Sequence, residues 1–286
     1  MATLQNKIDF SVVFRVKNAN PNGDPLNGNR PRVDYDGFGE VTDVCEKRKI
    51  RDRLMEAGES IFVQSDDNKK DDYPNLRKRA EAVLGKMDNP KDVREKACAT
   101  WFDVRAFGQV FPFKGNKKSN KNKEGGDGEG DQGVSIAIRG PVTIHSAFSV
   151  EPISSKVSSN QIIKSTSLEG DGINRQSDQM GMKHRVDNGI YVFFGSMNPQ
   201  LAERTGFSNK DAEIIKTILP KMFENDESAA RPAGSMEILK VIWWKHNNKS
   251  GQYSSAKVHR TLSVQPDGGI KLDTLSGLTP EILDGF

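Results

Sequence analysis

The sequence predicts an α+β protein with a ferredoxin-like or RRM-like core that carries large insertions. Residues 8–17 alternate apolar and polar side chains, as a half-buried β-strand does, and an amphipathic helix follows them. Residues 189–264 predict a strand, a second amphipathic helix and further strands. The predicted elements run β-α, insertion, β-β, insertion, β-α-β, so we expect one RRM-like domain with insertions over residues 1–286.

The loop between the first strand and the first helix is dense in glycine and proline, which excludes a helix or a central strand there. These residues are Gly23, Gly28, Gly37 and Gly39 with Pro21, Pro25 and Pro31. A helix then begins near Asp43, which we place at the N-cap with Glu46 in a position close to that of a capping box. The apolar stripe that predicts its core face consists of Ile50, Leu54, Ala57 and Ile61.

Cations form a second stripe on this predicted helix. Lys47, Arg48 and Arg51 fall on one face, with no carboxylate of the helix beside them. Cations near a helix N-terminus oppose the helix dipole, so this arrangement favours another use for them, and phosphate binding is the obvious one. Arg30 and Arg32 of the preceding loop would add to such a site. A solvated charged face is the alternative hypothesis.

Two helices and a low-complexity segment are predicted next. Apolar spacing indicates a short helix from Leu76 to Met87 and a longer one from about Asp92 to Phe107. Residues 114–133 hold lysines first and carboxylates after, and they bury too little apolar surface to order themselves. We expect a mobile insertion here. Either its basic half contacts a polyanion, or the segment is solvated and has no such role.

The second half of the chain predicts strands around a long polar segment. Residues 134–138 and 142–150 indicate a hairpin that turns at Gly140-Pro141. Residues 151–188 are rich in serine and cations, and we expect them to project as a hairpin or arm. The remaining predicted elements are a strand at 189–195, a helix capped by Ser208 with Asp211, and strands at 235–246 and 257–264.

Composition excludes several classes of protein. The chain has 35% hydrophobic residues, no apolar run as long as a membrane span and no signal-peptide pattern, so we expect a cytoplasmic protein that does not enter a membrane. Cys45 and Cys98 are far apart and form no CxxC, which excludes a disulfide framework and a cysteine zinc site. The net charge of +3 permits binding of nucleic acid without requiring it.

No motif of an enzyme is found in the sequence. GxSxG, HExxH and P-loop patterns are absent, and the four histidines have no metal-ligand spacing. Asp24, Asp34 and Asp36 in the early loop could hold Mg²⁺ for phosphodiester cleavage, or form Asx-turns beside the glycines. We favour the turns, and therefore predict no catalytic residue, no metal site and no cofactor.

Three stretches of the sequence together resemble one family. They are NANPNGDPLNGNRPRVD…VTDVCEKRKIRD, RGPVTIHSAFSVEPI and KHRVDNGIYVFFGSMNPQLAERTGF. They resemble the repeated backbone subunit of type I CRISPR surveillance complexes (Cascade), in the Cas-seven superfamily, and most closely subtype I-C. The resemblance implies an RRM-like palm, a finger-type helical insertion over residues 62–133 with the low-complexity loop 114–133, and a projecting thumb hairpin over residues 151–188.

The resemblance also implies a function and its partners. Members of the family polymerise as a helical filament along a CRISPR guide RNA in antiviral defence, and each thumb displaces one base of the guide. The implied partners are the guide RNA, target DNA through the guide, other copies of the chain and other Cascade subunits. Type I members are not nucleases. Type III relatives cut target RNA with an aspartate in the early loop, so a metal-dependent ribonuclease is the first alternative, and a domain that binds only protein partners is the second.

The family's guide contacts match particular residues of this chain. Cations of the loop, the first helix and the arm form the predicted RNA-binding set: Arg30, Arg32, Lys47, Arg48, Arg51, Lys164, Arg175, Lys183 and Arg185. The arm has no aromatic wedge, and Met180 and Met182 are the candidates for the residue that displaces a base. The aromatic stacking motif of RRM proteins is absent, so we expect the RNA to be held mainly by its backbone.

Overall fold

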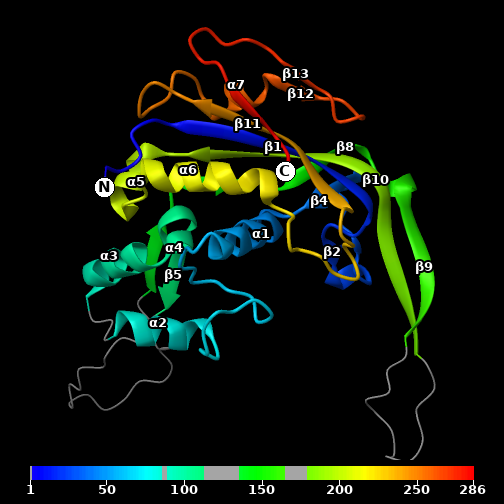
Figure 1. Cartoon of the computed structure of the whole chain (residues 1–286), viewed down its shortest axis with the longest axis horizontal. Coiled ribbons are helices and arrows are strands. Elements are labelled where there is room, and N and C mark those ends of the chain that lie inside the picture. Colours follow the sequence, from blue (N-terminus) through cyan, green and yellow to red (C-terminus); the bar gives the residue numbers. More distant parts are fainter. Residues whose placement is uncertain (1, 86–88, 113–134, 165–178) are drawn as a thin grey trace, which may run out of the picture.

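The computed structural model describes residues 2–85, 89–112, 135–164 and 179–286. Its centre is an eight-stranded antiparallel sheet in the order β14-β11-β1-β10-β8-β4, with β7 and β9 also paired to β10 (Figure 1). The strands are β1 (Ile8–Ala19), β4 (Phe38–Val41), β7 (Val142–Ile144), β8 (Ala147–Pro152), β9 (Val157–Lys164), β10 (Gln179–Met197), β11 (Met236–Lys245) and β14 (Glu281–Asp284).

The central strands have the order of a split β-α-β core. In the sheet, β11 lies beside β1, and β10 lies between β1 and β8. The helices α1 (Asp43–Glu56) and α6 (Asn209–Ile218) connect these strands in the β-α-β-β-α-β sense and pack on one face. The mixed α+β class and the antiparallel RRM-like core predicted from the sequence are thereby confirmed. The capping box of α6 between Ser208 and Asp211 is also present.

Both faces of this sheet are covered, so β1 is not half-buried as predicted. Phe10 and Phe14 point into the main core under the helices, whereas Val13 belongs to a second core on the other face. A C-terminal layer covers that second face (Figure 1). It contains α7 (Ser255–His259), β12 (Leu262–Val264) and β13 (Ile270–Leu272). Residues 257–264, predicted as one strand, are therefore the end of a helix followed by a short strand.

A polar residue of β1 is buried beneath this layer. Asp9 accepts a hydrogen bond from His246 at 2.9 Å and lies 3.2 Å from the ammonium of Lys7. Burial by itself would raise the pKa of Asp9, but these two partners lower it below its usual value. A carboxylate paired in this way is tolerated inside the second core. The alternation of apolar and polar residues in β1 therefore does not mark a solvated face.

The helical insertion packs around a hydrophobic cluster of its own. It consists of α2 (Leu76–Leu84), α3 (Pro90–Thr100), α4 (Phe102–Phe107), and the two-stranded sheet of β5 (Gly108–Pro112) with β6 (Ser135–Arg139). The predicted hairpin of 134–138 with 142–150 is wrong, because β6 pairs with β5. Gly108 has a φ of +84°, and a Cβ at this position would meet the carbonyl oxygen of Ile138 at 2.3 Å. Residues 113–134, including the low-complexity segment, lie outside the described residues.

Helix α1 differs from its prediction at both ends. Its N-cap is Thr42, whose hydroxyl accepts a hydrogen bond from the amide of Cys45, so the cap lies one residue before Asp43. The helix ends at Glu56, which leaves Ala57 exposed at the C-cap. Ile61 is buried, but it follows the helix. The predicted core stripe is thus confirmed for Ile50 and Leu54 within the helix.

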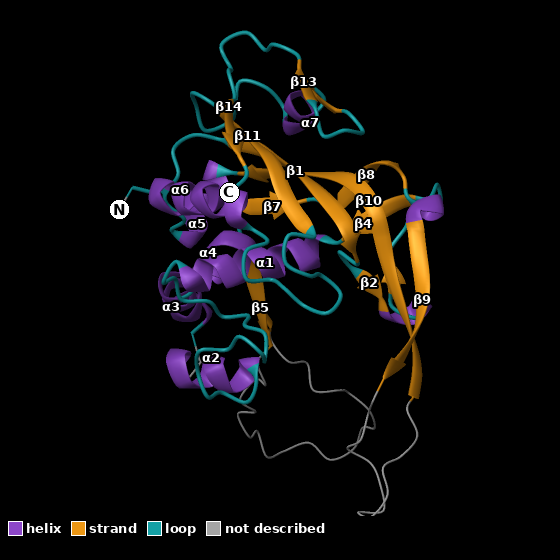
Figure 2. Ribbon diagram, turned by 45° about the vertical axis from the view of Figure 1, so that its right-hand side comes forward, coloured by secondary structure: helices purple, strands orange, loops and turns teal. Residues whose placement is uncertain are grey.

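The arm is the hairpin made by β9 and residues 179–186 of β10, which pair in antiparallel register. It extends away from the sheet on the side where α1 and the helical insertion lie, and Figure 2 shows the same arrangement after a rotation. At its base are the short strands β2 (Gly23–Asp24) and β3 (Arg30–Pro31). The remaining helix, α5 (Pro199–Thr205), follows β10. In the described part of the chain, no helix combines the length and apolarity needed to span a membrane.

Candidate nucleic-acid interface

The early loop is ordered by its aspartates. Asp24 accepts a hydrogen bond from the amide of Leu26 at 3.2 Å and lies 3.6 Å from the guanidinium of Arg32. Asp34 accepts from the amides of Asp36 at 3.0 Å and Phe38 at 2.9 Å. Our interpretation of Asp24 and Asp34 as turn-forming residues is confirmed. Within residues 2–85, 89–112, 135–164 and 179–286, no three His, Cys, Asp or Glu side chains are grouped to hold a metal ion.

The cations of α1 are not unneutralised, and that part of our prediction is wrong. Lys47 lies 2.8 Å from the carboxylate of Asp43, one turn earlier in the helix. Arg48 lies 3.9 Å from Asp52 and donates a hydrogen bond to the carbonyl of Val63 at 2.9 Å. The side chains of Lys47 and Arg48 nevertheless remain partly exposed, at 23% and 30%.

Arg51 is almost buried and is paired with Asp103. Its Nε donates to the carboxylate of Asp103 at 3.0 Å, and the two side chains are only 11% and 1% exposed. Burial lowers the pKa of Arg51, and Asp103 opposes that change. The carboxylate of Asp103 also accepts hydrogen bonds from the amides of Phe62 at 2.7 Å and Val63 at 3.0 Å. This network ties α1 to the start of the helical insertion and to α4.

The arm separates the predicted contacts onto two faces. Successive side chains of a strand point to opposite sides, so Met180, Met182 and His184 share one face while Lys183 and Arg185 share the other. Met180 and Met182 are 74% and 52% exposed. Lys183 is exposed, and Arg185 lies 3.3 Å from the carboxylate of Asp187. Lys164 ends β9 opposite Gln179, and its side chain, like the whole of Arg175, lies outside the described residues.

One contact joins the arm to the early loop. The ring of buried His184 is hydrogen-bonded through Nδ1 to the hydroxyl of Ser159 across the arm, at 2.8 Å. The exposed guanidinium of Arg30 donates to the same hydroxyl at 3.5 Å. Arg30 therefore lies at the base of the arm on the methionine face, and the loop and the arm form one continuous surface.

The sequence did not indicate the structural environment of three residues at this surface or behind it. Asp103 supplies the partner of Arg51 from a distance of 52 positions, and no local pattern shows that. Glu46 is fully buried in α1, and burial raises its pKa well above the usual value. Tyr35 is completely exposed at a turn of the loop, and only its position between Asp34 and Asp36 in a glycine-rich stretch could have suggested this.

Comparison with known proteins identifies the family. The "CRISPR-associated protein Cas7" of Haloferax volcanii is 26% identical over 291 residues, which cover 99% of this chain and 82% of the relative. A solved chain described as "CRISPR RNA-guided surveillance complex, pre-nicking" has a TM-score of 0.46 and 12% identity, and covers 83% of this chain and 78% of that one. Another, described as "CRISPR RNA-guided surveillance complex", has a TM-score of 0.41 and 14% identity, with coverage of 83% and 68%. The profile of the family described as CRISPR-associated protein Cas7 matches residues 6–276, nearly the whole chain, and the protein belongs to this family.

Proposed function

We propose that this protein is a non-catalytic backbone subunit of a type I CRISPR surveillance complex, of subtype I-C, and that copies of it line a guide RNA. The observation that supports this most is the match of the Cas7 family over residues 6–276. The chain's other partners would be the remaining Cascade subunits and, through base pairing with the guide, target DNA. Its place of action would be the cytoplasm.

The shape of the chain supports a proposed division of labour among its parts. The central sheet with α1 and α6 is the proposed palm, residues 62–133 the fingers and residues 151–188 the thumb. The helical insertion and the arm extend to the same side of the sheet (Figures 1 and 2). A strand of RNA that passes along α1 on that side would meet both of them.

The arm suggests how one strand is held in two segments. Arg30 lies beneath the methionine face, whereas Lys183 and Arg185 lie on the opposite face. A guide RNA divided by the arm would find cations on each side of it, and the exposed Met180 and Met182 would separate the bases. Phosphate contacts of this kind position RNA without selecting its sequence.

The remaining predicted cations differ in how well they suit this role. The side chains of Arg32, Lys47 and Arg48 are partly exposed, at 32%, 23% and 30%. Arg51 is committed to Asp103, and we assign it to positioning α1 rather than to RNA. Lys164 and Arg175 remain predicted contacts.

Co-expression with a CRISPR array tests the proposal. Purified protein should carry RNA of discrete length and show the absorbance ratio of a ribonucleoprotein. Changing Arg30, Lys183 and Arg185 together to Glu should reduce the recovered RNA by roughly tenfold or more, because each change replaces a phosphate contact by a repulsive charge. Lys271→Glu, an exposed change in the C-terminal layer, is the matched control. Protein free of RNA would count against this function and favour a domain with protein partners only.

The nuclease alternative is tested with the same assembly. Complementary RNA should stay intact in Mg²⁺, because the carboxylates of Asp24 and Asp34 are engaged by backbone amides of their own turns. Regular cleavage that disappears in Asp24→Asn or Asp34→Asn would instead make the protein a metal-dependent ribonuclease.

A further inference from the structure

The turn at residues 34–37 has a backbone held by hydrogen bonds and an exposed aromatic side chain at its tip. The amide of Gly37 donates to the carbonyl of Asp34 at 3.2 Å, and Asp34 and Phe38 close the turn through their backbones at 2.9 Å. The side chain of Asp34 fastens the same turn. Tyr35 at its tip is fully exposed, and Asp36 beside it is exposed as well. Tyrosine is enriched among the residues that anchor protein partners, and the negative charge beside it disfavours RNA phosphates.

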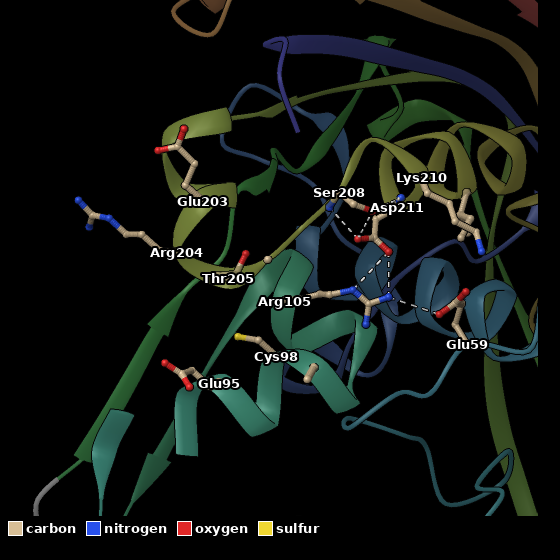
Figure 3. Close-up of a pocket in the computed structure, with 13 residues that line it drawn as sticks. Glu59, Glu95, Cys98, Arg105, Glu203, Arg204, Thr205, Ser208, Lys210 and Asp211 are labelled. Atoms are coloured by element: carbon tan, nitrogen blue, oxygen red, sulfur yellow. Dashed lines mark hydrogen bonds and ion pairs between the residues drawn. The ribbon is translucent and has the colours of Figure 1, made fainter. Parts of the chain in front are cut away.

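A pocket at another part of the molecule has the complementary character. It has a volume of about 630 Å³ and lies between α3 and α4 of the helical insertion and the helices α5 and α6 (Figure 3). This volume exceeds that of a tyrosine side chain several times.

The four carboxylates of this pocket are paired with three cations. Arg105 lies 2.8 Å from Asp211 and 3.5 Å from Glu59, as Figure 3 shows. Glu203 is paired with Lys249 and Glu95 with Lys91.

Two cations of the pocket have no such neighbour. Arg204 and Lys210 lie on either side of the Arg105–Asp211 pair, are exposed and form no ion pair with any residue in the described ranges (Figure 3). Counted with Lys91 and Lys249 at its rim, five cations face the four carboxylates of the pocket, so its net charge is positive and opposite in sign to that of the turn.

A chain cannot bring its own turn into its own pocket. The turn precedes β4, and β4 pairs with β8. Strand β8 in turn pairs with β10 at Tyr191, whereas α5 follows the end of β10 at Met197. At about 3.3 Å per residue, these places are roughly 20 Å apart along β10 alone. A contact between unlike surfaces of identical chains repeats from copy to copy, so it generates a filament or a ring.

We propose that the turn of one copy docks into this pocket of the next, with Tyr35 entering it and Asp36 facing Arg204 and Lys210. The contact deepens the proposed function, because it would be the interface through which neighbouring copies line one RNA. Burial of a tyrosine removes about 150–250 Å² from water, and the ion pairs at the rim fix its orientation. Asp34 stays within its turn and keeps the tip rigid.

The test separates assembly from RNA binding. Wild type, Tyr35→Ala and the double variant Arg204→Glu with Lys210→Glu are titrated onto a single-stranded RNA that holds one copy and onto a longer one that holds several. On the short RNA all three should bind within about twofold. On the long RNA both variants should lose cooperative filling, with an apparent affinity per copy lower by roughly tenfold, equal to about 1.4 kcal/mol. Lys271→Glu is the control, and circular dichroism checks folding.

Two further measurements make the contact specific. Asp36→Arg should abolish cooperative filling, and combining it with Arg204→Glu and Lys210→Glu should restore it, which a merely structural role would not do. A mixture of the tip variant and the pocket variant should give dimers on the long RNA and nothing longer, since only one complementary pair of surfaces remains.

The outcomes against the proposal are distinct. Cooperative filling that survives in both variants would overturn it, and so would an equal loss for Tyr35→Ala on the short RNA, which would make Tyr35 a nucleobase contact. If wild type binds no RNA, the proposed function fails, and sedimentation of concentrated protein then decides the contact. Self-association that Tyr35→Ala removes supports it, and its absence in wild type refutes it.

Discussion

The cations of α1 and those of the arm are alike in the sequence and different in the fold. Arg51 in α1 is 11% exposed and bound to Asp103, whereas Lys183 in the arm is exposed on a two-stranded hairpin. The clustering of positive charge on one face is similar in both. The difference is that α1 lies between the sheet and the helical insertion, so carboxylates from distant parts of the chain reach it.

This difference teaches what a helical wheel leaves out. A wheel shows which side chains of one helix are neighbours, but the partner of Arg51 lies 52 positions away. The arm has no packed layer on either side along most of its length, so few distant groups approach its side chains (Figure 1). A cluster of cations is a stronger candidate for ligand binding where the fold supplies no buried internal partner.

The largest expected effect is on stability, from Arg51→Ala. It removes one member of a buried ion pair and leaves the carboxylate of Asp103 short of a donor, which costs about 3 kcal/mol of unfolding free energy. Urea denaturation measures this. Arg48→Ala is the control, because its pair at 3.9 Å is more exposed and should contribute less than about 1 kcal/mol. If Arg51→Ala leaves the protein stable but weakens RNA binding, then α1 binds RNA as the arm is proposed to do.

A smaller effect is expected from Glu46→Gln in the same helix. Burial raises the pKa of Glu46 above its usual 4.5, so the unfolded chain gives up this proton at a lower pH than the folded chain does. The free energy of unfolding therefore falls as the pH rises from about 4.5 toward the folded value, and it is level above that value. The glutamine variant has no such dependence. It should be about 1 kcal/mol more stable than wild type at pH 8 and show little gain at pH 4.5. Thermal melts across this range measure it, and a gain independent of pH would contradict the assignment.

The smallest effect on stability belongs to the arm. Lys183→Ala with Arg185→Ala should change the unfolding free energy by no more than about 0.5 kcal/mol, since both side chains are exposed or partly so. If each holds one phosphate, the slope of log K against log salt for single-stranded RNA should become shallower by roughly 1.4.

The matched control for the arm is Arg260→Ala with Lys271→Ala, two exposed cations of the C-terminal layer. This layer covers the face of the sheet opposite α1 (Figure 1). Equal salt slopes for the two double variants would place the RNA elsewhere, and the contrast between α1 and the arm would then concern stability alone.

Elements with local causes could be predicted from the sequence alone. The alternation in residues 8–17 is β1, and the capping box of Ser208 with Asp211 begins α6. Asp24 and Asp34 of the early loop form turns because their side chains reach amides only two to four positions away. Polarity and glycine content predicted a hairpin between residues 151 and 188, and the described part of that segment contains one.

Only the tertiary structure decided the pairings over long distances. The partner of β6 is β5, the partner of Arg51 is Asp103, and β1 is covered on its second face by residues that follow it by more than 230 positions. The local pattern around each of these residues is compatible with several partners. Burial and charge neutralisation depend on which residues pack against a side chain in space. The periodicity of a segment shows only which of its own side chains share a face.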